Sequence, residues 1–370
     1  MTEDLPEKMR VAIDLTALAY NFTGIERYAF EVTKSLLEIN AAEDAPLEYI
    51  LVFKEEIHPP FDLFIQEGKA LAYVIKSNKG KLWVTQFELP RALNKINADR
   101  NLFLSFPAPI LYRSQNNISV IYDLTCWDFP ETISFKNRLF WRTAISRAIS
   151  SEGPIVTVSE FSKHRIIDRF QVEPEQVIVA YCASSDIFKE QMITLQQRRE
   201  MQDKYSLPEE FVLTVGTLEP RKNIPLLIQA WADLFEEKQI TADLVLSGRE
   251  GWMTNNLLSG LSEQQRAHVH ITGFVEDEDL PLLYAMSSLF VFPSLYEGFG
   301  MPPVEAVNSG AAVLCSDIEC LQEICKDEVS YFKSNDLSDL KQAMLRGARR
   351  GGSLSYNFRD SALRIRKLLR

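Results

Sequence analysis

The strongest constraint on the fold of this chain is the regular alternation of short apolar runs with longer amphipathic segments. In the first half, apolar runs lie at residues 9–15, 49–53, 70–75, 101–105, 119–122, 155–159 and 177–181. Helical spacing of apolar residues is found at 25–40, 138–150 and 160–170. The second half continues with runs at 211–216, 243–248, 268–274, 289–293 and 311–316, and with a helix over 224–238. Strands that alternate with helices in this way predict an α/β fold of parallel sheets with helices on both faces.

The length of 370 residues predicts two domains. Residues 184–208 are polar and poor in strand formers, so we interpret them as the connection between two Rossmann-like domains, 1–187 and 205–355. Ligands bind such sheets beyond the carboxyl ends of the strands. We therefore expect one cleft between the facing domains, lined by the loops 16–24, 216–223, 248–252, 274–279 and 293–300.

The composition excludes several classes of protein. Hydrophobic residues make up 46% and charged residues 25%, as in an ordinary globular protein. A formal net charge of -11 argues against nucleic acid as the main partner, because phosphate binding needs an excess of Lys and Arg. The five Cys and four His form no pattern typical of a zinc site. The acidic N-terminus has no apolar signal core, and no apolar run reaches the ~20 residues of a membrane-spanning helix. We expect a cytoplasmic protein.

The stretch 291–310 carries the clearest functional pattern. An apolar strand leads into a turn with Glu297, Gly298 and Gly300, and we expect a helix from about Pro303 with Glu305 in its first turn. Glycines let the backbone approach a ligand, and N–H groups at a helix start can hold phosphate oxygens, while carboxylates accept hydrogen bonds from hydroxyl groups. This inventory fits a nucleotide sugar. The residues alone are equally compatible with a structural turn, since the helix dipole also favours Glu in a first turn.

The second pattern is the stretch 215–223, which follows one predicted strand and opens a helix. Arg221 and Lys222 lie at the helix start, where the helix dipole opposes their charge. A bound anion would explain two cations at this position. The alternative is a solvated Arg-Lys pair on a loop, and the sequence leaves both interpretations open.

The sequence from Glu297 to Gly300, followed by Pro302, Glu305 and the run 309–314, resembles the signature of retaining glycosyltransferases of family four. The resemblance implies the GT-B architecture, with the final helix at 356–370 returning to the N-terminal domain. It implies that Lys222 contacts the donor phosphate, Glu297 the donor sugar and Glu305 the ribose hydroxyls. The implied catalytic residues are Glu297, Lys222, Arg221 and Asp123. The implied donor-binding residues are Gly24, Tyr122, Gly216, Thr217, Gly248, Phe274, Val275, Gly298, Phe299, Gly300 and Glu305.

Two positions depart from the pattern of that family. Thr217 stands where an Arg is often found, so Arg221 is expected to take over its role. Tyr122 stands where many relatives have His, and a phenol can donate a hydrogen bond to a sugar hydroxyl but cannot act as a base near neutral pH. We interpret Asp123 as a residue that orients the site or caps a turn, rather than one that transfers protons.

The resemblance implies transfer of a hexose, with retention, from a nucleoside-diphosphate sugar to a glycan or lipid-linked acceptor in bacterial surface polysaccharide synthesis. We expect neither a metal nor a cofactor, because fixed cations can stabilise the leaving diphosphate. GDP-mannose, dTDP-rhamnose and a UDP-hexose all remain open as donors. The alternatives are a nucleotide-sugar epimerase, a phosphorylase and a catalytically silent binding subunit. The basic, aromatic segment 135–147 and the basic C-terminus predict either peripheral contact with the inner face of the membrane or a packed surface helix.

Overall fold

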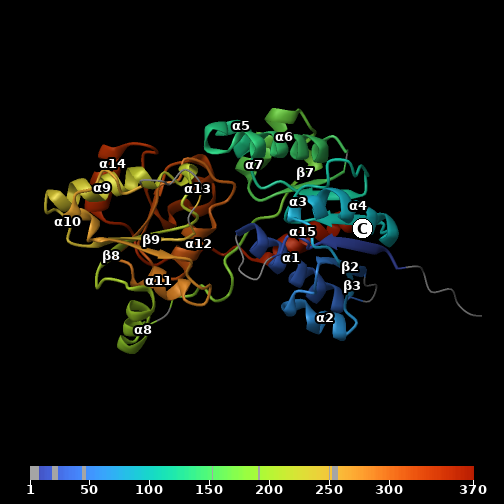
Figure 1. Ribbon diagram of the computed structural model, residues 1–370, viewed down its shortest axis with the longest axis horizontal. Helices are drawn as coiled ribbons and strands as arrows, with labels where there is room; N and C mark the ends of the chain where they lie inside the picture. Colours follow the sequence, from blue (N-terminus) through green and yellow to red (C-terminus); the bar gives the residue numbers. More distant parts are fainter. Residues whose placement is uncertain are drawn as a thin grey trace, which may run out of the picture. The chain divides into compact units, whose positions relative to one another are not determined.

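The computed structural model describes residues 8–18, 24–43, 47–151, 153–190, 192–249, 251 and 257–370. The chain divides into two compact units (Figure 1). Unit 1 comprises Met1–Asp128, Ile133–Cys182 and Tyr356–Arg370, and unit 2 comprises Phe129–Thr132 and Ala183–Ser355. The final segment of the chain therefore belongs to the same unit as its beginning.

Unit 1 contains a parallel sheet of seven strands in the order β3-β2-β1-β4-β5-β6-β7. The strands are β1 (Arg10–Asp14), β2 (Glu48–Lys54), β3 (Leu71–Ile75), β4 (Arg100–Phe103), β5 (Asn117–Val120), β6 (Ile155–Thr157) and β7 (Val177–Val179). The chain builds outward from β1 to β3 and then crosses to the other side at β4. The strand order thus reverses between β1 and β4, and such reversal points are where open α/β sheets bind ligands.

The helices of unit 1 flank this sheet. They are α1 (Gly24–Ala41), α2 (Asp62–Gln66), α3 (Lys81–Trp83), α4 (Leu89–Ile96), α5 (Thr125–Asp128), α6 (Phe135–Ile149), α7 (Glu160–Phe170) and α15 (Phe358–Leu369). None of the helices in the ranges given above is long and apolar enough to cross a membrane.

The last helix, α15, lies beside α1 (Figure 1). Its Arg366 is only 3% exposed. The guanidinium donates to the Tyr49 hydroxyl at 2.9 Å and to Asn40 Oδ1 at 3.1 Å, and it forms an ion pair with Glu43. A buried guanidinium needs such partners, because an unpaired buried charge is strongly unfavourable. These contacts fix α15 to α1 and to the second strand, β2, of unit 1.

Unit 2 contains a second parallel sheet, of six strands in the order β10-β9-β8-β11-β12-β13. Its strands are β8 (Phe211–Val215), β9 (Asp243–Ser247), β10 (Val269–Gly273), β11 (Leu289–Phe292), β12 (Val313–Ser316) and β13 (Ser330–Phe332). Its helices are α8 (Leu195–Tyr205), α9 (Ile224–Glu236), α10 (Glu263–Arg266), α11 (Leu280–Met286), α12 (Met301–Asn308), α13 (Glu319–Cys325) and α14 (Leu337–Arg346). The order of this sheet reverses between β8 and β11.

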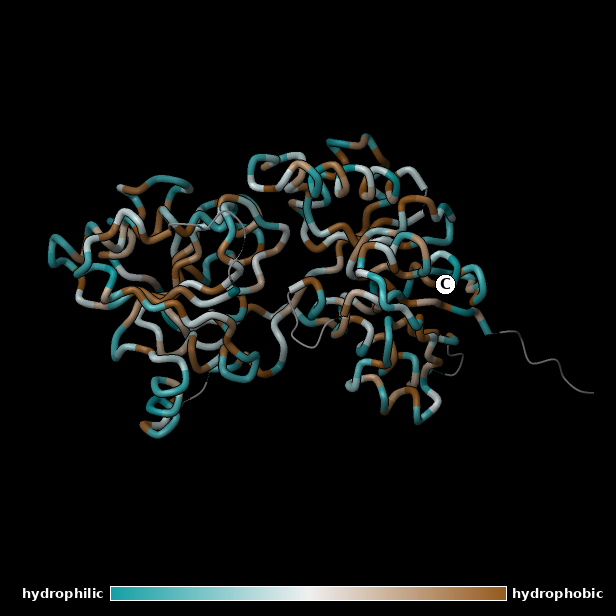
Figure 2. Tube along the Cα trace, viewed as in Figure 1, coloured by the Kyte–Doolittle hydropathy of each residue, from teal (hydrophilic) through white to brown (hydrophobic). Residues whose placement is uncertain are grey.

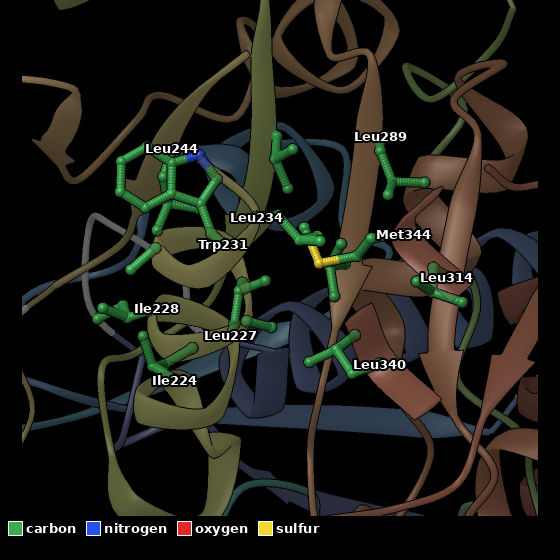
Figure 3. Close-up of a cluster of buried hydrophobic side chains, with 14 of the residues drawn as sticks. Ile224, Leu227, Ile228, Trp231, Leu234, Leu244, Leu289, Leu314, Leu340 and Met344 are labelled. Carbon is green, nitrogen blue, oxygen red and sulfur yellow. The ribbon is translucent and has the colours of Figure 1, made fainter. Parts of the chain in front are cut away.

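The core of unit 2 forms between this sheet and the helices α9 and α14. Leu227, Trp231 and Leu234 of α9 meet Leu340 and Met344 of α14 and the apolar side chains of the strands (Figure 3). The Trp231 indole is fully buried, and its Nε1–H donates to the Ala242 carbonyl at 2.9 Å. The polar edge of this large side chain is therefore satisfied, as burial requires.

The connection predicted over 184–208 contains a helix that the sequence interpretation missed. Thr194 and Gln197 form a reciprocal capping box at the start of α8. Met201 is its one buried residue, and α8 is mostly hydrophilic in Figure 2. A helix held by its cap more than by an apolar face has little hydrophobic periodicity, which explains why this pattern escaped detection.

Candidate functional site

The turns after β8, β9 and β10 are held together at the carboxyl edge of the sheet in unit 2. The Gly216 N–H donates to the Ser247 carbonyl at 2.9 Å, and the Gly248 N–H donates to the Gly273 carbonyl at 2.8 Å. Gly248 has φ +140°, and a Cβ there would lie 2.0 Å from the Gly216 oxygen. Only glycine fits this position, so the sequence permits a close approach of the two backbone turns that follow β8 and β9.

A buried ionic cluster lies where the strand order of unit 2 reverses, between β8 and β11. Lys222 belongs to a short 3₁₀ turn, Pro220–Lys222, that follows β8, and Glu297 lies in the turn that follows β11. The Lys222 Nζ is 2.6 Å from Glu297 Oε1, and the Arg221 Nη1 is 2.8 Å from Glu297 Oε2. Glu297 is 6% exposed. One carboxylate thus holds both cations that the sequence singled out.

Arg221 also ties the two turns together. Its Nη1 donates to the Tyr296 carbonyl at 2.6 Å, and its Nη2 pairs with Glu219 at 2.7 Å. Its own carbonyl accepts from the Leu295 N–H at 2.9 Å. The guanidinium therefore binds groups of the protein on two sides. These contacts are those of a residue that positions Lys222 and Glu297.

The protonation states of the cluster follow from burial and charge. Burial pushes the pKa of Glu297 upward, but the charges of Arg221 and Lys222 and the hydrogen bond from Lys222 outweigh it and hold the pKa at about 2. Burial also lowers the pKa of Lys222, and the charge of Glu297 opposes that effect. Glu297 is consequently an anion near neutral pH. The Lys222 ammonium also lies over the Phe292 ring, 4.8 Å from its centroid.

The helix that follows Glu297 begins earlier than expected. Gly300, at φ +90°, is its N-cap, and α12 starts at Met301. Glu305 therefore lies beyond the first turn, and the prediction that placed it in that turn was wrong. The Glu305 side chain is buried, and its Oε2 accepts a hydrogen bond from the Tyr284 hydroxyl at 3.1 Å. No local sequence pattern indicates this contact, because Tyr284 lies on the separate helix α11.

The other residues predicted for the donor site in unit 2 lie around the same edge. Gly298 and Phe299 are buried, whereas Thr217 is exposed. Val275 is buried, and the Arg249 guanidinium lies over the Phe274 ring at 4.8 Å from its centroid. Of the predicted loop 248–252, residues 250 and 252 lie outside the described residues.

Three predicted site residues belong to unit 1. Gly24 is the first residue of α1, and residues 19–23 of the predicted loop lie outside the described ranges. The Tyr122 hydroxyl donates to the Leu104 carbonyl at 2.6 Å. Burial raises its pKa well above the ordinary value, so this phenol stays protonated. Asp123 Oδ1 accepts from the Thr125 N–H at 2.8 Å and from the Thr125 hydroxyl at 2.5 Å, which are the contacts of a turn cap.

The sequence of the chain is similar to those of known proteins. Residues 197–347 match the family described as glycosyl transferases group 1. An O-antigen chain mannosyltransferase B of Escherichia coli is 28% identical over 354 residues, which cover 91% of this chain and 90% of that protein.

Two solved structures establish the fold over nearly the whole length. WaaG, a glycosyltransferase involved in lipopolysaccharide biosynthesis, superposes with a TM-score of 0.67 at 16% identity and covers 91% of this chain and 90% of its own. HepE of Anabaena in complex with UDP and glucose superposes with a TM-score of 0.63 at 15% identity and covers 96% and 94%. The chain is therefore a glycosyltransferase with the GT-B fold that carries the domain of the glycosyl transferases group 1 family.

Proposed function

We propose that this protein transfers mannose, with retention of configuration, from a nucleoside-diphosphate sugar to a growing glycan of a bacterial surface polysaccharide. The observation that carries the proposal is the buried cluster of Lys222, Arg221 and Glu297 where the strand order of unit 2 reverses. The near full-length similarity to an O-antigen chain mannosyltransferase supports mannose as the sugar and a polysaccharide as the product. GDP-mannose is the donor that we place first.

The chemistry requires stabilisation of a leaving diphosphate. As the bond to the sugar breaks, negative charge grows on a phosphate oxygen and positive charge grows on the sugar carbon. The Lys222 ammonium has three N–H donors, one of which binds Glu297 in this structure. We assign the others to the diphosphate, because a fixed cation in a buried site stabilises developing negative charge more strongly than a cation in water. The Glu297 carboxylate then serves two purposes: it orients Lys222 and it accepts from a hydroxyl of the transferred sugar.

We propose that the reaction needs neither a divalent metal nor a cofactor. The support is the fixed positive charge of Lys222, together with the backbone N–H groups of the turn at 298–300, which suit phosphate oxygens. Arg221 contributes by holding Lys222 and Glu297 in place. Retention is consistent with attack of the acceptor on the face that the diphosphate leaves, with a phosphate oxygen taking the proton of the acceptor hydroxyl.

A panel of nucleotide sugars tests the proposal. We expect GDP-mannose to raise the melting temperature more than UDP-glucose or dTDP-rhamnose, because a ligand that binds only the folded state stabilises it. With methyl α-D-mannoside as acceptor, the product should be an α-linked disaccharide, and the one-bond C1–H1 coupling in NMR spectra reports the anomeric configuration. Excess EDTA should leave the rate unchanged. Release of free mannose without transfer would favour a hydrolysing epimerase, and binding without turnover would favour a silent subunit.

We further propose that α6 contacts the cytoplasmic face of the membrane, where lipid-linked acceptors are found. Phe135 and Leu139 are 69% and 59% exposed on this helix. The Arg138 guanidinium lies over the Phe135 ring, 5.4 Å from its centroid, so a cation accompanies the exposed apolar surface. Vesicles with anionic lipid should carry the protein upward in flotation, and Phe135→Ser with Leu139→Ser should abolish this. Binding that persists in the double variant would exclude α6 as the contact.

A further inference from the structure

The sheet of unit 1 has its own point of reversal, between β1 and β4. The two strands are parallel neighbours there, and Asp14 at the end of β1 pairs in register with Phe103 at the end of β4. In unit 2 the equivalent point, between β8 and β11, carries the cluster of Lys222 and Glu297. Because ligands of such sheets bind at these points, the residues just beyond β1 and β4 are candidates for a second binding site.

Asp14 is a buried carboxylate with one oxygen in use. It is 1% exposed. Its Oδ1 accepts from the Thr16 N–H at 3.0 Å and from the Thr16 hydroxyl at 2.7 Å. Its Oδ2 is buried and has no hydrogen-bond partner within the part of the chain that the structure describes. Burial raises the pKa of Asp14, which the hydrogen bonds from Thr16 and the charge of Lys81 partly offset.

A second buried polar atom without a partner lies just beyond the neighbouring strand. Ser105 follows β4 by two residues and is 2% exposed. Its Oγ has no hydrogen-bond partner among the described residues. The backbone before it is fixed, since the Tyr122 hydroxyl donates to the Leu104 carbonyl at 2.6 Å. A buried hydroxyl without a partner is costly in free energy, and two such oxygens at one point of reversal call for a common explanation.

The surroundings supply the other groups that sugar sites use. The Lys81 ammonium lies 3.4 Å from Glu26 Oε1 and 5.2 Å from the centroid of the Phe106 ring. Phe106 follows Ser105 directly and stacks on Trp141, with ring centroids 5.4 Å apart and planes 9° from parallel. Carboxylate and hydroxyl oxygens bind sugar hydroxyls, and aromatic rings with a cation provide a platform beside them.

We propose that Asp14 and Ser105 form a binding site for a pyranose ring at the β1–β4 reversal, with Asp14 Oδ2 and Ser105 Oγ as hydrogen-bond partners of its hydroxyls. This inference rests on the proposed glycosyl transfer. The chemistry of the site is shared by two sources, the acceptor sugar and the transferred sugar, and the experiment separates them. The two unpartnered oxygens destabilise the free protein. Hydrogen bonds from the bound ligand restore that lost stability.

The first part of the experiment measures the melting temperature without ligand. Ser105→Ala removes a hydroxyl that has no partner, so the melting temperature should stay the same or rise. The matched control is Ser119→Ala, because Ser119 is 3% exposed on β5 and its Oγ accepts from the Ala108 N–H at 3.1 Å. That substitution leaves a buried N–H unpaired and should lower the melting temperature. A Ser105→Ala protein that melts below Ser119→Ala would show that a water or a protein group already satisfies Ser105, and would overturn the proposal.

The second part measures ligand binding in Ser105→Ala and Asp14→Asn, with GDP-mannose as donor and methyl α-D-manno-, gluco- and galactopyranosides as acceptors. Loss of the hydrogen bond to the Asp14 carboxylate should raise the KM of one sugar on the order of tenfold to a hundredfold, and loss of the hydrogen bond to the neutral Ser105 hydroxyl should raise the same KM on the order of tenfold or less. A rise confined to the acceptor KM, with donor hydrolysis unchanged, assigns the site to the acceptor. A rise in donor KM and a fall in hydrolysis assign it to the transferred sugar.

The proposal would be overturned if the donor KM and the acceptor KM of both variants were the same as those of the wild type. Failure of the proposed sugar site can be distinguished from failure of the proposed function. Should the wild type turn over no nucleotide sugar, the rise in melting temperature caused by millimolar methyl pyranosides still tests the site. That rise should be present in the wild type and in Ser119→Ala, and reduced in Ser105→Ala and Asp14→Asn. An equal rise in all four proteins would sink the inference.

Discussion

Replacing Lys222 with alanine is expected to lower kcat/KM for the nucleotide sugar by on the order of 10²–10³-fold, the usual effect of removing one preorganised donor from a developing oxyanion. Lys222 is 12% exposed at its side chain and lies 2.6 Å from Glu297. Its removal leaves the Glu297 carboxylate with Arg221 as the remaining cation in the cluster. The loss should therefore fall mainly on turnover, with a smaller change in the melting temperature.

Steady-state kinetics with the donor from the thermal panel would measure this effect. Lys341→Ala is the matched control, because Lys341 pairs with Asp233 at 3.2 Å and Glu237 at 3.0 Å on the outer face of unit 2. Surface pairs of this kind contribute little, so this variant should keep wild-type kinetics. Near wild-type turnover in the Lys222→Ala enzyme would remove the basis of the proposed mechanism.

Replacing Glu297 with glutamine is expected to cost unit 2 about 3–5 kcal/mol of unfolding free energy, since it leaves the buried Lys222 ammonium without its carboxylate partner and Arg221 with Glu219 alone. The pH dependence of this difference in unfolding free energy follows from the lowered pKa of Glu297. The folded pKa of Glu297 is about 2, below the ordinary value of 4.5, so ionised Glu297 stabilises the folded state fully above 4.5. That contribution is lost as the pH falls through about 2. The difference between wild type and Glu297→Gln should be constant from pH 5 to 8 and shrink below pH 4.

Urea unfolding at several pH values would measure this difference, followed by tryptophan fluorescence in a protein whose Trp residues other than Trp231, in the core of unit 2, are replaced by Phe. Glu237→Gln provides the control, because it removes a partly exposed carboxylate from the Lys341 pair. That change should cost less than about 1 kcal/mol. A Glu297→Gln protein no less stable than Glu237→Gln would contradict the view that Glu297 is a shared counter-charge of Lys222 and Arg221.

The sequence predicts the strands of both sheets well, because apolar runs bounded by turns are local signals. It also indicates the helix α7 with the bounds that the structure has, since Ser159 caps that helix through the Ser162 N–H. Contacts between turns that are far apart in the sequence have no such local signal. Nothing local in the sequence shows that Arg221 binds the Tyr296 carbonyl, or that the Tyr122 hydroxyl binds the Leu104 carbonyl. Such contacts depend on the tertiary arrangement.

A short repeated tripeptide is a further local signal in the sequence. The tripeptide Asp-Leu-Thr occurs at 14–16 and again at 123–125, after two strands of the same sheet. The structure gives both copies the same turn, in which the Thr N–H and hydroxyl donate to the Asp carboxylate. Only the second copy entered the predicted site, through the resemblance to family four. The first copy is the one that is buried with an oxygen lacking a partner among the described residues.

The ion pair between Arg366 and Glu43 has a consequence for biosynthesis. Unit 2 is almost continuous in sequence and is complete once Ser355 has left the ribosome. Unit 1 lacks α15 until Phe358–Leu369 emerge, although β1 is made long before them. Domains of a nascent chain usually fold from the N-terminus onward. Here the order is inverted: the later half can finish first, and the earlier half must wait, with the α1 surface uncovered, until α15 emerges from the ribosome.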